Sequence, residues 1–392
     1  MKNGCKLRIM IVSGVVPSLS RGGGCLALHR HFCERDDFAV AACGYETAQT
    51  SCSEALQMTR PKWWSRAKRT RVCRILENAD YLVAKRRLPR PLLEFARKWQ
   101  PNLIFGVADD LHTPMAFRLA RTMRIPIALN FQDLFACSAF VASSARPFPP
   151  VKSLLLKRYH DSQARADAVF HTSDGMKEWF GPSARGDVLY PIGAAAQISE
   201  PVEKPPSGRL KLVYAGNCYG AYGALLLRLA CAVENTKNIS LEIFTMGNDW
   251  PQAQVTHFSH SGTYKGYLPF SELKSKFREA DMFLTAMSFA RSDKTFVQTS
   301  FTTKWLDYAP CSKPIVVWAP HYSSAARFAY GTGAGLVIED DDPKSVIARI
   351  QAVRAHPEQW SSLARGACNV AKNELNADRL HNLLNKRLSA LV

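Results

Sequence analysis

Two hydroxyl side chains and an ammonium group stand together in the stretch SFTTKWLDYAPCSKPIVVWAP, residues 300–320. Thr302, Thr303 and Lys304 come directly before a short apolar pattern that is typical of a helix. Backbone N–H groups are free at the start of a helix, so hydroxyls and a cation placed there favour an anion such as a phosphate. The competing interpretation is an ordinary helix that Ser300, Thr302 or Thr303 caps.

A buried strand would hold this helix in place. Trp305, Leu306 and Ala309 give the predicted helix an apolar side, and Pro310 ends it. Residues 315–318 are uniformly apolar, as in a parallel strand that is covered on both faces. The sequence therefore predicts a loop, a helix and a central strand in immediate succession.

A second candidate contact with a ligand lies near the N-terminus. Residues 8–13, RIMIVS, form a predicted strand, and the loop that follows contains Gly22, Gly23 and Gly24 before a helix that starts near Leu26. Glycine has no side chain, so such a loop lets a ligand approach the backbone closely. The spacing is not G-x-G-x-x-G, and a dinucleotide fingerprint is therefore not supported.

Polar residues also follow a predicted strand over residues 125–131. Gln132 and Asp133 come directly after it, at the strand end where ligands of open parallel sheets gather. Asp133 is a candidate to orient or deprotonate a substrate hydroxyl, and Gln132 is a candidate to bind that substrate. A turn that closes the strand is the structural alternative for Asp133.

Asp109, Asp110 and His112 follow the predicted strand over residues 103–107 and would face the same edge. Asp109 and His112 are therefore candidates for binding the same substrate. An Asp-Asp pair before a helix is also common capping chemistry, so both interpretations stand.

Strands and helices alternate in two series, which predicts an α/β protein with two Rossmann-like domains facing each other across a cleft. The first domain covers residues 1–192. Residues 193–208, GAAAQISEPVEKPPSG, are small or proline and form the predicted interdomain linker. The second domain covers residues 209–375, and a leucine-bearing helix over residues 376–392 then requires a packing partner.

Charge is concentrated in one region of this basic chain, whose formal net charge is +18. Residues 60–98 hold 13 Lys or Arg against three acids, and Trp63 and Trp64 stand among the cations. This composition favours an anionic membrane surface. A solvated basic face and a nucleic-acid site are the alternatives; two adjacent Trp are not a spaced stacking ladder, so we expect no nucleic-acid partner.

The remaining composition excludes several classes of protein. No apolar tract reaches membrane-spanning length, and the first residues lack a cleavage pattern, so we expect a cytoplasmic protein. The 11 cysteines include no C-x-x-C pair, which predicts free thiols. His257 and His260 are spaced like ligands but stand in a predicted polar loop without a third ligand, so we expect no metal site.

The order of several segments resembles the GT-B glycosyltransferases, in particular the large retaining family four and its relatives. The segments are RIMIVSGVVPSLSRGGG, LVYAGN, GYLPFSELKSKFREADMFLTAMS and TTKWLDYAPCSKPIVVWAP. The similarity covers nearly the whole chain and is strongest over residues 210–342. It implies the GT-B fold, with the last helix crossing back to complete the N-terminal domain.

The resemblance assigns roles to particular residues. Gly23 and Gly24 match the glycine loop near the acceptor and the donor phosphates. Gly216, with its neighbour Asn217, matches the glycine after the first strand of the donor domain. Asp307, in Leu-Asp-Tyr, matches the acid that holds the nucleotide ribose.

The sequence also departs from the family pattern. Thr299 stands where the family has the first of two glutamates, and Gln132 replaces the histidine that usually precedes Asp133. Asn217 and Cys218 stand where a basic pair is common. We expect Lys304 to supply the missing positive charge. Lys304 and, for its position after a strand, Asp133 are the candidate catalytic residues.

The expected activity is transfer of a sugar from a nucleotide-diphosphate donor to a lipid-linked or polysaccharide acceptor, with retention and without a metal. No cofactor is expected beyond the nucleotide-sugar co-substrate, and a UDP-sugar is favoured over a GDP-sugar. The enzyme would work peripherally at the inner face of the cytoplasmic membrane. A nucleotide-sugar epimerase and a non-catalytic nucleotide-sugar-binding protein are the alternatives.

Overall fold

A computed structural model describes residues 6–20, 23–60, 62–67, 70, 72–83, 88–134 and 147–392. Two sets of residues named above lie outside these ranges: Gly22, and six cations of the basic region at positions 68, 69, 71 and 85–87. The chain divides into two compact units. The N-terminal unit is Met1–Ile192 with Ala377–Val392, and the C-terminal unit is Gly193–Asn376.

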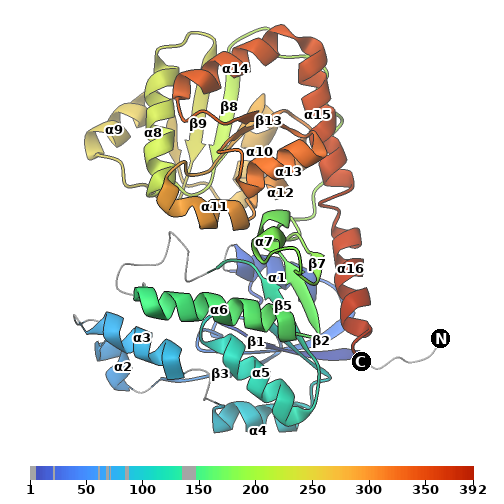
Figure 1. Ribbon diagram of the computed structural model, residues 1–392. Coiled ribbons are helices and arrows are strands. Elements are labelled where there is room, and N and C mark those ends of the chain that lie inside the picture. Colours follow the sequence, from blue (N-terminus) through green and yellow to red (C-terminus); the bar gives the residue numbers. More distant parts are fainter. Residues whose placement is uncertain are drawn as a thin grey trace, which may run out of the picture. The chain divides into compact units, whose positions relative to one another are not determined.

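A seven-stranded parallel sheet forms the centre of the N-terminal unit, in the order β3-β2-β1-β4-β5-β6-β7 (Figure 1). Strands β2 and β3 are added on one side of β1, and β4 to β7 on the other. The strand order therefore reverses between β1 and β4, the position where open α/β sheets bind ligands. The strands are β1 (Leu7–Val12), β2 (Phe38–Gly44), β3 (Glu54–Gln57), β4 (Leu103–Val107), β5 (Ile127–Phe131), β6 (Ala168–His171) and β7 (Asp187–Val188).

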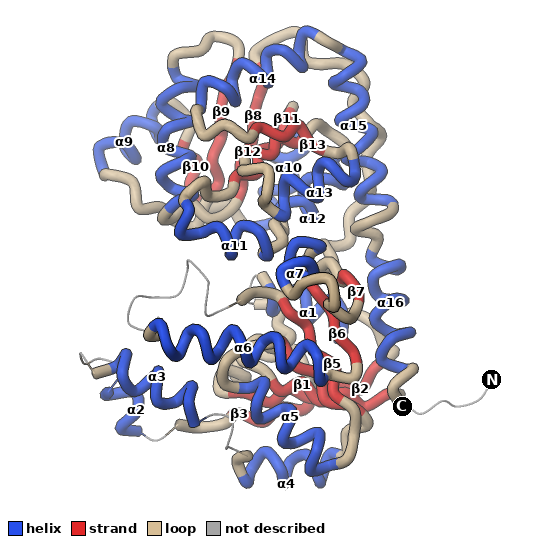
Figure 2. The backbone as a smooth tube through the Cα atoms, in the orientation of Figure 1, coloured by secondary structure: helices blue, strands red, loops and turns tan. Residues whose placement is uncertain are grey.

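Helices cover both faces of this sheet (Figure 2). Ile104 of β4 packs with α4, α5 and α6, whereas its neighbour Phe105 meets Phe32 of α1 with ring centroids 4.8 Å apart. Alternate residues of one strand thus enter two different apolar layers. The helices are α1 (Gly24–Phe32), α2 (Lys62–Ala67), α3 (Cys73–Val83), α4 (Arg90–Trp99), α5 (His112–Met123), α6 (Pro149–Arg165), α7 (Asp174–Trp179) and α16 (Ala377–Ser389).

The last helix, α16, belongs to the N-terminal unit although it ends the chain. His381 is buried, and its Nε2 lies 2.7 Å from the Asp37 carboxylate. Arg387 donates to the carboxylate of Asp187 at 2.9 Å. These contacts give α16 the packing partner that its leucines require.

A six-stranded parallel sheet forms the C-terminal unit, in the order β10-β9-β8-β11-β12-β13. The order again reverses after the first strand of the unit, between β8 and β11. The strands are β8 (Leu210–Ala215), β9 (Ile239–Phe244), β10 (Tyr264–Gly266), β11 (Met282–Ala286), β12 (Ile315–Trp318) and β13 (Gly335–Ile338).

Eight α-helices surround this second sheet in the described residues of the unit. Leu226 and Leu229 of α8 share one apolar cluster with Val346 of α14 and with inward residues of β8 and β9. The helices are α8 (Ala221–Glu234), α9 (Gln252–His260), α10 (Phe270–Glu279), α11 (Lys294–Thr299), α12 (Lys304–Tyr308), α13 (Ser324–Thr332), α14 (Pro343–Ala355) and α15 (Pro357–Lys372).

The first helix of each unit begins in the same unusual backbone conformation. Gly23 precedes α1 with φ 60° and ψ −131°, and Gly220 precedes α8 with φ 58° and ψ −131°. Residues with a side chain rarely adopt a positive φ, so glycine suits both positions. A Cβ at either position would meet no atom within 4 Å, so space is open beside both helix starts.

Residues 193–208 lie along the C-terminal unit as an extended segment. The N–H groups of Ser199 and Val202 donate to the carbonyls of Pro310 and Ser312 at 2.8 and 3.1 Å. Arg354 donates to the carbonyl oxygens at the end of the segment, among them that of Gly208. The segment is therefore anchored along much of its length by hydrogen bonds to a single unit.

Some predictions of local structure are wrong. His257 and His260 lie in helix α9 and not in a loop. Their partners are local: the Nε2 of His257 lies 2.5 Å from Glu234, and the Nδ1 of His260 lies 2.9 Å from the Thr256 carbonyl.

Within the described ranges, no helix is both long enough and apolar enough to cross a bilayer.

Candidate functional site

Lys304 and Gly216 meet at the carboxyl edge of the C-terminal sheet. Lys304 opens α12, and Gly216 directly follows β8. A Cβ placed on Gly216 would lie 2.9 Å from the Lys304 Nζ, so only a glycine leaves room for the ammonium group. Gly216 also has φ +147°, where side chains are strained. The structure therefore brings together two residues that the sequence placed in separate segments.

Aromatic rings line the other side of the same ammonium group. The Lys304 Nζ lies 4.8 Å from the centre of the Tyr214 ring and 5.9 Å from that of Tyr222. Ring faces attract a cation and replace part of its lost hydration. Burial nevertheless lowers the pKa of Lys304 to about 8, although the nearby Asp307 carboxylate acts in the opposite direction. An anion bound here would stabilise the protonated form.

Helix α12 is held against β8 by Tyr308. The Ala215 N–H donates to the Tyr308 hydroxyl at 2.8 Å, and the Tyr308 ring stacks on Phe283 with centroids 4.4 Å apart. Both aromatic rings are fully buried. The contacts of Tyr308 with the core of the unit therefore hold the helix that carries Lys304 in place.

The predicted helix caps are wrong. Thr303 occupies the position before α12, but its side chain makes no capping hydrogen bond and is exposed. The Thr302 hydroxyl is buried and lies 3.2 Å from the hydroxyl of Thr285 on β11. Thr302 therefore joins α12 to the sheet, while Thr303 faces solvent beside Lys304.

A carboxylate that the sequence analysis did not identify caps the start of helix α8. Asp249 accepts a hydrogen bond from the Gly220 N–H at 2.7 Å, directly before α8. A Cβ on Gly223 would lie 2.3 Å from the other oxygen of Asp249, so the carboxylate lies over the first turn. Because Asp249 comes from the loop after β9, sequence spacing gives no signal for this cap. The exposed Asn217 accepts from the Tyr219 N–H at 3.2 Å and shapes the same loop.

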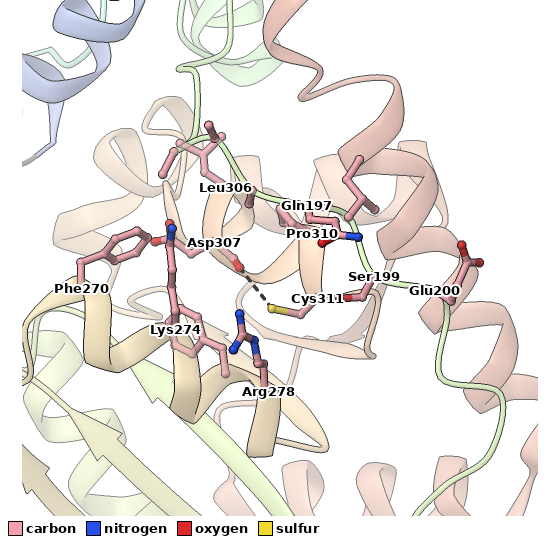
Figure 3. Close-up of a pocket in the computed structure, with 15 residues that line it drawn as sticks. Gln197, Ser199, Glu200, Phe270, Lys274, Arg278, Leu306, Asp307, Pro310 and Cys311 are labelled. Atoms are coloured by element: carbon pink, nitrogen blue, oxygen red, sulfur yellow. Dashed lines mark hydrogen bonds between the residues drawn. The ribbon is translucent and has the colours of Figure 1, made fainter.

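Asp307 lines a pocket of about 440 Å³ in the C-terminal unit (Figure 3). Phe270, Lys274 and Arg278 of α10 line the opposite wall, and Figure 3 shows the two cationic side chains directed into the space between α10 and α12. The anchored segment over residues 194–200 completes the lining. A carboxylate beside cations and an aromatic ring suits a ligand with hydroxyl and anionic groups.

At the carboxyl edge of the N-terminal sheet, Asp109 is engaged by its own surroundings. One carboxylate oxygen accepts from the N–H groups of Leu111 and His112, and the other accepts from the Gly14 N–H at 3.1 Å. The second oxygen also lies 2.7 Å from the His112 Nδ1. Burial raises the pKa of Asp109, but His112 and these N–H donors outweigh it, so the pKa lies below its usual value. This geometry supports the capping interpretation of Asp109.

His112 is buried beside Asp109 and packs edge-on against Tyr45, with ring centroids 5.3 Å apart. Its Nε2 is buried and has no hydrogen-bond partner among the residues that the structure describes. Asp110 is half-buried; burial and then Asp109 raise its pKa to about 7.

Gln132 and Asp133 follow β5, as predicted, and both are half-buried. A Cβ on Gly24 would lie 2.1 Å from the Gln132 side-chain oxygen, so the glycine allows Gln132 to reach the start of α1. Gly23, the preceding residue, has open space around it. The structure thus brings Gln132 and Gly24 together, with Asp133 next in the chain.

No metal-binding cluster emerges from the described portion of the sequence: no group of three or more His, Cys, Asp or Glu side chains there has suitable proximity.

The sequence matches no protein-family model and no curated protein. Solved structures do match over almost the whole chain. Sucrose-phosphate synthase from Thermosynechococcus elongatus has 13% identity and a TM-score of 0.65, with 98% of this chain and 99% of that chain covered. The Anabaena protein HepE, in complex with UDP and glucose, has 12% identity and a TM-score of 0.62, with 99% and 100% covered.

Trehalose-6-phosphate synthase from Burkholderia multivorans has 12% identity and a TM-score of 0.61, with 98% of each chain covered. These neighbours are GT-B glycosyltransferases, and their similarity extends across both units. Together with the two parallel sheets, it confirms the predicted α/β architecture and the GT-B fold.

Proposed function

We propose that this GT-B-fold chain is a glycosyltransferase that moves a sugar from a nucleotide-diphosphate donor to a lipid-linked or polysaccharide acceptor, with retention. The observation that carries the proposal is the ammonium group of Lys304 held beside Gly216 at the switch point of the C-terminal sheet. A neighbour of the same fold holds UDP and glucose, which supports a UDP-sugar as the donor.

Lys304 would stabilise the leaving diphosphate. As the bond from the sugar to the phosphate breaks, negative charge grows on the phosphate oxygens, and a fixed cation stabilises that charge more than it stabilises the substrate. Gly216 lets the phosphate approach the backbone without a side chain in the way, and the exposed Thr303 adds a hydroxyl donor. This charge comes from the protein, so we propose a metal-independent reaction.

Asp307 would bind the ribose of the donor. Its place on the wall of the 440 Å³ pocket gives a ribose hydroxyl a carboxylate acceptor, and Phe270 offers an apolar surface on the opposite wall. In the N-terminal unit, Asp133 would orient the acceptor hydroxyl or accept its proton. Gln132, held at Gly24, would bind the same acceptor.

Residues 60–98 would bring the enzyme to an anionic membrane. Trp63 is 56% exposed on α2, and Ile75 is 59% exposed on α3. Exposed apolar side chains among Lys and Arg are typical of proteins that lie on a bilayer surface. Trp64, by contrast, is buried beneath the Arg60 guanidinium, which lies 4.4 Å from its ring centre, and so is unavailable to lipid.

A thermal-shift panel of UDP-, GDP- and ADP-sugars tests the donor site, with Lys304→Ala and Asp307→Ala as variants. We expect a UDP-sugar to raise the melting temperature of the wild type and to act weakly on both variants. The site assignment is wrong if no nucleotide shifts the wild type, or if both variants respond as the wild type does.

Product analysis separates the competing activities. A transferase releases UDP together with a glycosylated acceptor, and lipid extracts or polysaccharide serve as acceptor. A nucleotide-sugar epimerase would produce an altered sugar nucleotide with no acceptor present, and a binding protein would leave the donor unchanged under all conditions. Retention is tested by the anomeric configuration of the transferred sugar.

A further inference from the structure

Two helices of the N-terminal unit line one groove with regularly spaced residues. The stripe on α5 is Pro114, Phe117, Arg118, Arg121 and Thr122, and the stripe on α6 is Arg158, Asp161, Ser162 and Arg165. Spacings of three and four residues place each set on one face of its helix. Together they line a surface groove of about 670 Å³.

The groove is strongly positive. Four of its lining residues are arginines, and Asp161 is its only lining acid. Guanidinium groups that share one groove repel each other, and a bound anion relieves that repulsion. All the cations are Arg and none is Lys, which favours phosphate, because a planar guanidinium donates two parallel hydrogen bonds to phosphate oxygens.

Two of the arginines are held in place by the protein. The Arg165 guanidinium lies 4.9 Å from the centre of the Phe117 ring, which links α6 to α5. Arg158 donates to the carbonyl oxygens of Tyr81 and Leu82 at 2.5 and 3.3 Å. Its Nε is buried without a hydrogen-bond partner among the described residues. Preorganised cations of this kind lose little conformational entropy when a ligand binds.

Arg158 connects the groove to helix α3, which carries exposed apolar residues. Arg158 binds the carbonyls of the last turn of that helix, where Leu82 is 48% exposed and Val83 is 42% exposed. Ile75, on the same helix, is 59% exposed. A soluble phosphate needs no exposed apolar neighbour, whereas a bilayer offers headgroup phosphates and acyl chains side by side.

We propose that the α5–α6 arginine groove binds the headgroup phosphates of an anionic phospholipid bilayer while the exposed apolar residues of α3 enter the interface. This inference extends the membrane contact in the proposed function, which rested on residues 60–98 alone. It assigns the phosphate contacts to α5 and α6, outside that region.

Co-sedimentation of the full chain with vesicles tests the groove. Three proteins are compared: the wild type, the groove variant Arg118→Gln/Arg121→Gln and the matched control Lys344→Gln/Arg349→Gln. Each is mixed with vesicles of phosphatidylglycerol and phosphatidylcholine, or of phosphatidylcholine alone. The control removes two exposed charges from α14 of the C-terminal unit. We expect the groove variant to bind the anionic vesicles about tenfold more weakly or worse, and the control to bind as the wild type does.

Equal binding of the two double variants to anionic vesicles would overturn the proposal, as would a wild type that does not distinguish the two vesicle types. Inorganic pyrophosphate or duplex DNA that binds the wild type through Arg118 and Arg121 as tightly as the vesicles do would assign the groove to another ligand. The UDP-sugar thermal shift of the groove variant is measured in parallel. If the groove variant keeps this thermal shift, its weaker vesicle binding is not caused by unfolding. If the wild type shows no thermal shift but binds anionic vesicles, the proposed donor site fails and the lipid groove stands.

Discussion

The two units place opposite chemistry at equivalent edges of similar sheets. Both sheets are parallel, both reverse their order after the first strand, and both first helices begin at a glycine with nearly the same φ and ψ. The N-terminal edge carries Asp109, satisfied by backbone N–H groups and His112. The C-terminal edge carries Lys304, whose pKa is lowered by burial. Similar sheets therefore present an ionised carboxylate at one edge and an ammonium group at the other.

The comparison also separates stability from function. Asp109 is a half-buried acid whose ionised form is stabilised by His112 and backbone N–H donors, which lower its pKa. Lys304 is a cation whose charged form the protein destabilises. A group kept in an unfavourable charge state within an accessible site is a sign of ligand binding, because selection for stability alone would remove it.

Replacing the cation should have the largest effect. Lys304→Met is expected to weaken binding of a nucleotide diphosphate about 100-fold, since a charge-assisted contact contributes roughly 2–3 kcal/mol. The same variant should gain about 1–3 kcal/mol in free energy of unfolding at pH 7, because it no longer buries an ammonium group. Titration calorimetry and urea unfolding measure the two effects, with Lys344→Met as the exposed control. A variant that loses stability and keeps its affinity would break the comparison.

Asp109→Ala tests the opposite edge. It leaves the N–H groups of Gly14, Leu111 and His112 without their acceptor, so we expect a loss of about 2 kcal/mol in the free energy of unfolding. Affinity for the nucleotide diphosphate should stay within about twofold of the wild-type value, because Asp109 and the proposed donor-binding residues share no hydrogen-bond partner in the described structure and belong to different compact units. Urea unfolding and calorimetry on one preparation measure both. A large fall in affinity with unchanged stability would show Asp109 to be a ligand-binding residue.

Gly216→Ala sharpens the assignment of the donor edge. The positive φ and the 2.9 Å approach to the Lys304 Nζ should cost about 1–2 kcal/mol of stability and displace the ammonium group, lowering nucleotide affinity about tenfold. Gly208→Ala is the matched control, since a Cβ there meets nothing within 4 Å. Equal behaviour of the two variants in thermal-shift and binding measurements would refute the close contact.

The smallest expected effect is a pH dependence. An anion binds the protonated lysine, so affinity should fall about tenfold from pH 7 to pH 9, as pH rises through the pKa of about 8 for ligand-free Lys304. The sign for stability is opposite: the pKa is lower in the folded chain, so its stability rises between pH 8 and the unfolded value near 10.5. Lys304→Met should show neither trend in calorimetry or urea unfolding, and a wild-type affinity that is flat over this range would exclude Lys304 as the phosphate contact.

Sequence reasoning predicted the buried strands correctly. The apolar runs over residues 103–107 and 315–318 became β4 and β12 with unchanged bounds, because strands buried on both faces leave a continuous apolar signal. Helices α2, α3 and α4 were not predicted, because residues 60–98 were interpreted by their charge and not by their periodicity. The periodic signal is present in α4, where Leu92 and Ala96 are buried on one face. Helix α9 was assigned to a loop because its sequence, QAQVTHFSH, is mainly polar.

The site was harder to predict than the strands. Lys304 was recognised from its neighbours in sequence, but the rings of Tyr214 and Tyr222 that surround its ammonium group come from β8 and α8. The Asp249 cap comes from the loop after β9. Local spacing carries no information about such contacts, since only the folded sheet brings these segments together.

The carboxylate of Asp249 at the start of α8 has a consequence for turnover. A nucleoside diphosphate set free at this edge would carry more negative charge than the single ammonium of Lys304 balances, and Asp249 would repel the excess. Such an arrangement holds a spent leaving group loosely. Product departure would then be quick, and accumulated nucleoside diphosphate would be a poor inhibitor.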